Sequence, residues 1–175
     1  GSHHMSEHFR HWLGGLVHCS RELALLFAPT VNSYKRYADV GMFAPNSVNW
    51  GFDNRTCTVR VSGVGRLEYK IPDSSVNPYL SHVLLLAAIR DGLRNKIDPG
   101  QPVIGDGSST TSEATRYLPK TLGDAITAFD QNPVIHEALP GEMASLYREL
   151  KADEWARYCS FVTDWEKAMY EDYLP

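Results

Sequence analysis

Charged and apolar positions alternate along one short stretch of the chain. Residues 66–71 read RLEYKI, so that Arg66, Glu68 and Lys70 alternate with three apolar residues. Because successive side chains of a strand point to opposite faces, the pattern predicts a strand with one apolar face and one face that carries a row of charges of both signs. An ordinary solvated strand shows the same alternation, so the pattern alone does not assign a function.

Two further strands are predicted before this one. The segments 48–52 and 56–61 are short and rich in apolar and β-branched residues, which is typical of strands. The sequence SGVG at 62–65 is typical of a hairpin turn that joins 56–61 to 66–71. We therefore expect a small antiparallel sheet, and an α+β fold in which helices pack on it.

Apolar residues recur at helical spacing in much of the remaining chain. Helices are predicted at about 7–27, 77–95, 122–129, 134–139 and from 140 onward, with a short helical turn at 32–37 and a long surface loop at 98–117. The helix at 77–95 is apolar nearly all round, so we expect it to be buried on most sides. The last helix carries a stripe that we interpret as core or as a subunit contact: Trp155, Tyr158, Val162, Trp165 and Met169.

Composition narrows the class of protein. The chain has 175 residues, 43% of them hydrophobic, and a formal charge of −4, which fits one globular domain or part of a larger one and gives no basic surface for nucleic acid. Cys19, Cys57 and Cys159 lack metal-site spacing and favour reduced thiols in a cytoplasmic protein. The run HVLLLAAI is too short to cross a membrane, so we expect no membrane association. GSHHM at 1–5 reads as an expression-tag remnant.

Several segments resemble one enzyme family in their order and separation. They are NSYKR at 32–36, DNRTCTVRV at 53–61, RLEYKIPD at 66–73, VNPYL at 76–80, NKIDPG at 95–100, LPKTLGDAI at 118–126 and VTDWE at 162–166. Over residues 6–175 the chain resembles the C-terminal part of the catalytic domain of glutamine synthetases. Its pattern is most similar to members that make γ-glutamylmethylamide and other γ-glutamylamines.

The resemblance implies an activity and its cofactors. It implies a ligase that joins the side-chain carboxylate of glutamate to ammonia or an amine, through a γ-glutamyl phosphate made from ATP. Such a reaction needs divalent metal, Mg²⁺ or Mn²⁺, to bridge the nucleotide phosphates, and arginines to hold phosphoryl oxygens.

The resemblance also implies roles for four arginines. Arg36 falls at the arginine that holds the substrate glutamate, and Arg55 at the arginine that steadies the transferring phosphoryl group, so both are candidate catalytic residues. Arg60 and Arg66 fall at arginines near the nucleotide phosphates. Each of the four could instead belong to an ordinary ion pair.

Two charged residues of the strand at 66–71 complete the implied site. Glu68 falls at a metal-binding glutamate, which would explain a carboxylate flanked by cations. Lys70 stands where the family usually has an arginine; it keeps the charge but loses the forked donors, and it could still attract the substrate glutamate. Asp53 stands where many members have an arginine before the NR pair.

The loop after SYKR departs further from the family pattern. Ammonia-using members have a glutamate just before Ala-Pro, where this chain has Phe43, and Asp39 is the only carboxylate in this acceptor loop. A phenyl ring cannot take a proton from ammonium. The difference favours an amine over ammonia as the acceptor.

The resemblance places the N-terminal β-grasp domain and the first half of the catalytic domain outside this chain. One carboxylate cannot hold two or three divalent ions, so we expect the chain alone to be inactive. For the full-length protein the resemblance implies a homo-oligomeric double ring, with glutamate, ATP and ammonia or an amine as partners. A relative retired from catalysis, with a structural or regulatory role, stays open as the alternative.

Overall fold

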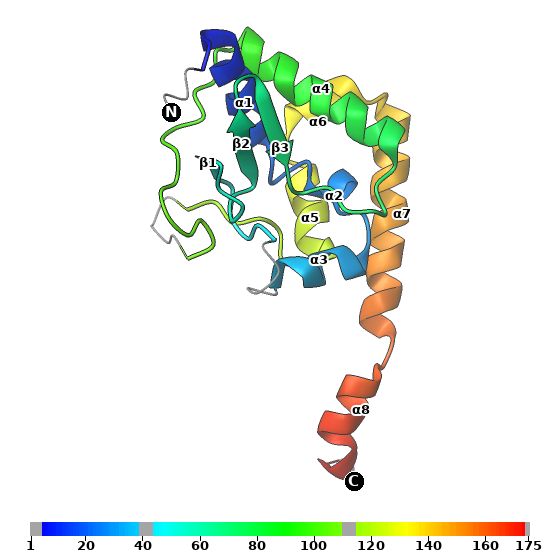
Figure 1. Cartoon of the computed structure of the whole chain (residues 1–175). Coiled ribbons are helices and arrows are strands. Elements are labelled where there is room, and N and C mark those ends of the chain that lie inside the picture. The colour runs from blue at the N-terminus through cyan, green and yellow to red at the C-terminus, as the bar shows by residue number, and fades with distance from the viewer. Residues whose placement is uncertain (1–4, 39–43, 110–114, 174–175) are drawn as a thin grey trace.

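Helices pack together beside a small sheet, and a helical arm extends away from this body beyond the end of α7 (Figure 1). The computed structural model describes residues 5–38, 44–109 and 115–173. The helices are α1 (Glu7–Cys19), α2 (Ala24–Phe27), α3 (Val31–Ala38), α4 (Pro78–Arg94), α5 (Leu122–Phe129), α6 (Pro133–Ala138), α7 (Gly141–Ser160), α8 (Asp164–Tyr170) and the 3-10 helix η1 (Glu171–Tyr173). The strands are β1 (Trp50–Phe52), β2 (Val59–Gly63) and β3 (Arg66–Tyr69). The α+β fold is confirmed.

The sheet has the strand order β1-β2-β3. β2 and β3 form the predicted hairpin and pair antiparallel, with Arg60 opposite Glu68. β1 and β2 pair in parallel, with Trp50 opposite Val59, so the prediction of an entirely antiparallel sheet was wrong for this pair. The reason lies in the connection 53–58, which carries the chain back along the short strand β1. Alternation along a strand does not encode the direction of its neighbour.

Helix starts follow local signals in the sequence. The Asn77 side chain caps α4, with Pro78 in the first turn. Thr121 and Asp124 form a capping box at the start of α5. These local contacts explain why both helices begin where the sequence predicts.

α4 is less buried than its composition predicts. Its buried residues are Ser81, Leu84, Ala88 and Gly92, whereas the Leu86 side chain is 64% exposed. Only one face of α4 packs, mainly against α1, so the prediction of burial on most sides was wrong. No other segment of the described chain covers the outer face of α4.

The predicted last helix is two helices. α7 ends at Ser160, and Thr163 begins α8 with a capping box to Glu166. Trp155 is half-buried against Gly123 of α5, but Tyr158, Val162, Trp165 and Met169 are exposed. The interpretation as core therefore fails for those four residues, and the interpretation as a subunit contact stays a prediction.

Candidate functional site

A row of alternating charges crosses the sheet. Asp53 directly follows β1, Arg60 lies in β2, and Glu68 lies opposite Arg60 in β3. The Arg60 guanidinium donates from Nε to Asp53 Oδ1 at 3.0 Å and from Nη1 to Glu68 Oε2 at 3.1 Å, and its Nη2 also donates to Asp53. These hydrogen bonds, first the ones to Asp53 and then the one to Glu68, raise the pKa of Arg60 above its ordinary value. The sheet therefore holds one cation between two carboxylates.

Two further arginines flank this row without acidic partners. Arg55 lies in the turn 53–58 and Arg66 begins β3, and both side chains are exposed. Among residues 5–38, 44–109 and 115–173, no hydrogen bond or ion pair engages either guanidinium. Both therefore keep their forked donors available for an anion.

A cleft of about 600 Å³ opens beside the row. Its lining combines the turn after β1, Arg60 and a distant loop: Phe52, Asp53, Asn54, Arg55, Arg60, Pro102, Val103, Ile104 and Gly105. The cleft thus presents two of the predicted phosphate-binding arginines, Arg55 and Arg60, to one space.

The loop segment 102–107 is a part of the site that sequence reasoning missed. Its backbone is tied to the sheet, because Val103 N donates to Trp50 O at 2.8 Å and the Asn54 side chain donates to Gly105 O at 2.7 Å. Gly107 N donates to Thr56 Oγ1 at 2.7 Å. The only signal in the sequence is the polar character of Asn54 and Thr56, which does not name a partner some fifty residues away.

Lys70 directly follows β3 and contacts the turn that carries Arg55. Its ammonium donates to the Arg55 carbonyl oxygen. Burial lowers the pKa of Lys70 below its ordinary value, and the neighbouring Glu68 carboxylate opposes that shift. Lys70, which departs from the family pattern, therefore contacts the site through the backbone of Arg55.

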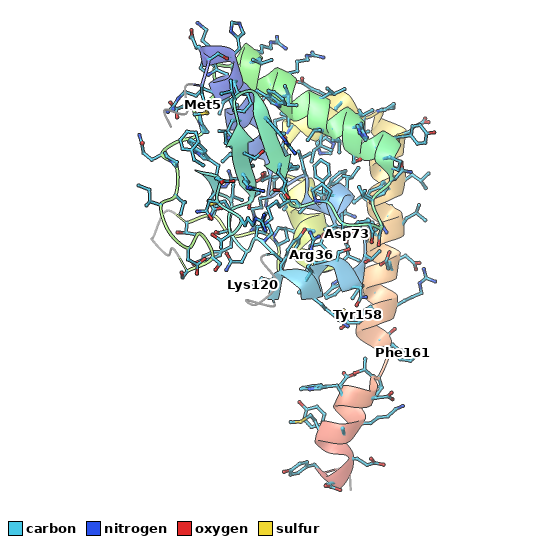
Figure 2. The ribbon with its side chains drawn as sticks, viewed as in Figure 1. Met5, Arg36, Asp73, Lys120, Tyr158 and Phe161 are labelled. Atoms are coloured by element: carbon cyan, nitrogen blue, oxygen red, sulfur yellow. The ribbon has the colours of Figure 1, made fainter. Side chains whose placement is uncertain are left out.

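Arg36 of α3 reaches the same end of β3 from the helical side; Figure 2 labels it. Its guanidinium donates to the carbonyl oxygens of residues 70, 71 and 72 and, from Nη2, to the Tyr37 hydroxyl. Nε is buried and has no hydrogen-bond acceptor in the described chain. Arg36 thus joins α3 to β3, and one buried donor remains unsatisfied.

Asp39 and Phe43, the predicted acceptor-loop residues, lie outside the described residues. The predicted site is therefore observed at Arg36, Arg55, Arg60, Arg66, Glu68 and Lys70. Five of these six lie on β2, on β3 or in the segments next to these strands, and Arg36 contacts the end of β3.

Metal binding by this chain would rest on few ligands. In the described ranges no group of three or more His, Cys, Asp or Glu side chains is placed to share a metal ion. Glu68 is 52% exposed and can present carboxylate oxygens, which suit Mg²⁺. A hard cation held there needs further oxygen ligands from substrate, water or other polypeptide.

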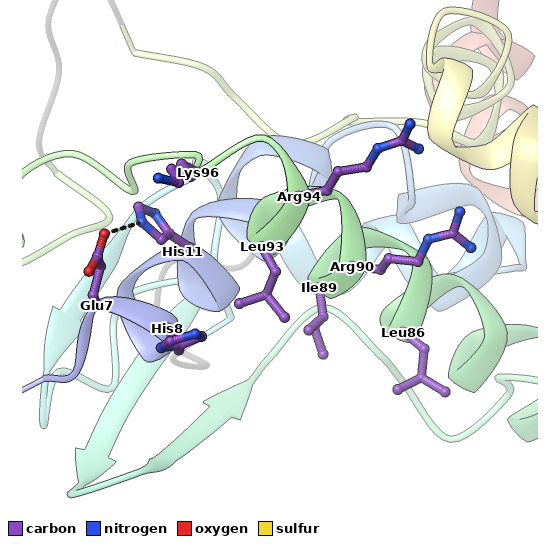
Figure 3. A pocket seen from close by; sticks show the side chains of 9 residues that line it. All are labelled: Glu7, His8, His11, Leu86, Ile89, Arg90, Leu93, Arg94 and Lys96. Atoms are coloured by element: carbon purple, nitrogen blue, oxygen red, sulfur yellow. Dashed lines mark ion pairs between the residues drawn. The ribbon is translucent and has the colours of Figure 1, made fainter.

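A second cleft, of about 760 Å³, lies between α1 and α4 (Figure 3). Its lining is Glu7, His8, His11, Leu86, Ile89, Arg90, Leu93, Arg94 and Lys96, and the His11 ring pairs with Glu7 at 3.5 Å. None of the six predicted site residues that the structure describes lines it. Its larger volume is therefore no reason to prefer it as the reaction site.

Comparison with known proteins decides the family. The family model described as "Glutamine synthetase, catalytic domain" matches residues 1–170. The chain belongs to the glutamine synthetase family. A glutamine synthetase of Rhizobium meliloti (strain 1021) is 41% identical over 171 residues, which are 93% of this chain and 39% of that relative. A glutamate–methylamine ligase of Methyloversatilis universalis is 38% identical over 176 residues, covering 94% of this chain and 39% of the ligase.

Solved structures agree with this family assignment. A structure titled as a GmaS/ADP complex superposes with a TM-score of 0.90 at 36% identity, over 98% of this chain and 41% of that one. The glutamine synthetase family therefore accounts for the fold, and this chain spans about two fifths of the relatives it matches. Within the described residues, no helix is both long enough and apolar enough to span a bilayer.

Proposed function

We propose that this chain is part of an ATP-dependent ligase that joins glutamate to an amine or ammonia, and that it supplies phosphate-binding arginines and one metal-binding carboxylate. The observation that carries the proposal is the charged row on the sheet, where Glu68 lies among Arg60, Arg66 and the exposed Arg55. Guanidinium groups beside a carboxylate suit a metal–nucleotide complex, because the metal needs oxygen ligands and the phosphates need cationic donors.

The roles follow from these positions. Arg55 and Arg60 line one cleft, so we assign both of them to phosphoryl oxygens. We assign Arg66, the first residue of β3, to the same anion. Glu68 would hold Mg²⁺ or Mn²⁺, which when bound neutralises phosphate charge. Because Glu68 accepts a hydrogen bond from Arg60, it would exchange this partner for the metal.

Arg36 and Lys70 are assigned to the substrate glutamate. The buried Nε of Arg36 has no acceptor in the described chain, and an unsatisfied buried donor is costly. A substrate carboxylate would satisfy it. Lys70, half-buried at the end of β3 beside Glu68, adds a cation on the same side of the site.

We propose a primary amine, rather than ammonia, as the acceptor. Phe43 stands where ammonia-using members have a carboxylate, and Asp39 is the loop's only acid. Relatives at 38% and 33% identity are named glutamate–methylamine and glutamate–isopropylamine ligases. Other relatives are named glutamine synthetases, so the choice of an amine rests on the loop sequence and not on the names of the relatives.

We also propose that the full-length protein is a homo-oligomer, built as a double ring. The exposed aromatic residues of α7 and α8 support a contact between copies. Since no three His, Cys, Asp or Glu side chains of the described residues are placed to share a metal ion, we expect the 175-residue chain alone not to release phosphate from ATP.

The deciding experiment is phosphate release by the full-length protein with ATP, Mg²⁺ and glutamate, offered ammonium, methylamine, ethanolamine and a polyamine in parallel. Turnover with an amine and little with ammonium is the expected result. Turnover best with ammonium would refute the amine assignment but keep the ligase. No phosphate release with any acceptor, together with no metal-dependent ADP binding, would refute the ligase and favour a structural or regulatory relative.

A further inference from the structure

We infer that Asp53 is a positioning residue of the phosphate-binding face: it orients Arg60 and thereby lets Glu68 leave Arg60 for a metal ion. The inference rests on the proposed function, which assigns Arg60 to phosphate and Glu68 to metal. Asp53 itself is assigned to neither ligand. It acts through the guanidinium that it contacts.

The contacts around Arg60 are unequal. Asp53 Oδ1 accepts from both Nε and Nη2 of Arg60, whereas Glu68 accepts from Nη1 alone. Two donors from one guanidinium fix the plane of that group better than a single contact does. Asp53 therefore determines the orientation of Arg60, and Glu68 makes the contact that is easier to give up.

The backbone places the Asp53 carboxylate where these contacts require it. Asp53 has a φ of +47°, in the left-handed region that Asp and Asn tolerate better than most residues. Its amide N donates to Val61 O at 2.9 Å, which continues the pairing of β1 with β2 beyond Phe52. The carboxylate is thus tied to the strand next to Arg60.

This arrangement resolves a competition for Glu68. A carboxylate that binds a metal must give up part of its interaction with an arginine, and an arginine left without an acid would hold Glu68 more tightly. With Asp53 present, Arg60 retains a counter-charge and its orientation after Glu68 turns to the metal. Without Asp53, the metal and Arg60 compete for one carboxylate.

The alternative role of Asp53 predicts the opposite sign. The Asp53 side chain is 68% exposed and lines the cleft with Arg55 and Arg60. If its charge merely repelled phosphate, its removal would strengthen nucleotide binding, because the local charge would become more positive. Positioning instead predicts that removal weakens binding of the metal–nucleotide complex.

The test is Asp53→Asn, which keeps the shape and the tolerance for positive φ but removes the charge. In the full-length protein we expect the Kd for ADP in the presence of Mg²⁺ to rise about tenfold, within the range of one coupled charged contact, with a smaller change when Mg²⁺ is absent. Combined with Glu68→Gln, the effect of Asp53→Asn should largely vanish. The matched control is Asp153→Asn, which breaks the exposed Arg157–Asp153 pair on α7 and should leave both affinities unchanged.

A spectroscopic readout on this chain needs no nucleotide. The Nε–H resonance of Arg60 should exchange slowly with water, and Asp53→Asn should speed that exchange, because an amide oxygen is a weaker acceptor for a guanidinium than a carboxylate. Unchanged exchange, or tighter ADP binding by Asp53→Asn, would overturn the inference while the proposed function stands. Absence of ADP binding by the unsubstituted protein would refute the proposed function, and the role of Asp53 with it.

Discussion

Arg55 carries a charge that the described chain leaves uncompensated. Its side chain is exposed and lies in the turn after β1, so Arg55→Gln should not disturb packing. We expect an unfolding midpoint within about 1 °C of the parent, but a loss of about 10²-fold or more in kcat for glutamate-dependent phosphate release by the full-length protein. Arg157→Gln on α7 is the matched surface control. An unchanged kcat would contradict the assignment of Arg55 to the site, and a large fall in the unfolding midpoint would mean that Arg55 stabilises the fold.

The three thiols differ in burial. Burial raises the pKa of Cys57 to about 11 and that of Cys19 to about 12, whereas Cys159 is exposed. A raised pKa keeps a thiol neutral below that value, and the thiolate is the form that reacts with alkylating agents. At pH 8 we expect iodoacetamide to label Cys159 alone in the folded chain, measured by mass spectrometry of the peptides. Rapid labelling of Cys57 would mean that the turn 53–58 opens in solution.

At the scale of elements, glycines determine how closely α1 and α4 approach. A Cβ at Gly92 would lie 2.3 Å from His11 O, and one at Gly15 would lie 2.0 Å from Ala88 O. Sequence reasoning treats a glycine within a helix as a weakness. The packing shows instead that a larger side chain there would push the two helices apart.

Gly92→Ala tests this close approach. Alanine favours the helix by about 1 kcal/mol, yet the clash is with backbone and should cost about 2–4 kcal/mol, so we expect a net loss in the free energy of unfolding. Urea unfolding followed by circular dichroism measures it. Gly63→Ala is the control, because no atom lies within 4 Å of a Cβ built there. Equal stability of the two variants would show that the α1–α4 contact is looser than the structure has it.

At the scale of the whole molecule, the C-terminal arm adds little to the folded body. Among the described elements, α8 packs substantially only against η1, and Phe161, Trp165 and Met169 are exposed. Removal of residues 161–175 should therefore leave the unfolding midpoint of a dilute sample within about 2 °C of that of the whole chain. Differential scanning calorimetry checks this, and a large fall would show that the arm folds back on the body.

The same truncation tests the predicted subunit contact. If the exposed stripe joins copies of the chain, the whole chain should associate as its concentration rises, and the shortened chain should not. Sedimentation velocity at several concentrations separates these outcomes. Identical behaviour of both chains would contradict a contact made through α8.

The hairpin of β2 and β3, the charged face of β3 and the starts of α4 and α5 all followed from the sequence, because each depends on residues a few positions apart. Alternation places Glu68 with Arg66, a hairpin turn brings Arg60 opposite Glu68, and Asn77 or Thr121 caps the next turn of chain. Membership of the glutamine synthetase family was likewise predicted from the order of short segments and confirmed by the family match. The individual roles of the arginines stay predictions.

Contacts between distant segments decided the rest. The parallel pairing of β1 with β2 brings Asp53 to Arg60, and residues 102–105 of the distant loop line the cleft beside them. The exposure of α4 and its glycine contact with α1 depend on which other segments pack against α4. The composition of this one helix does not contain that information. Local order is encoded by near neighbours, whereas the environment of a charged side chain depends on every segment that folding brings to it.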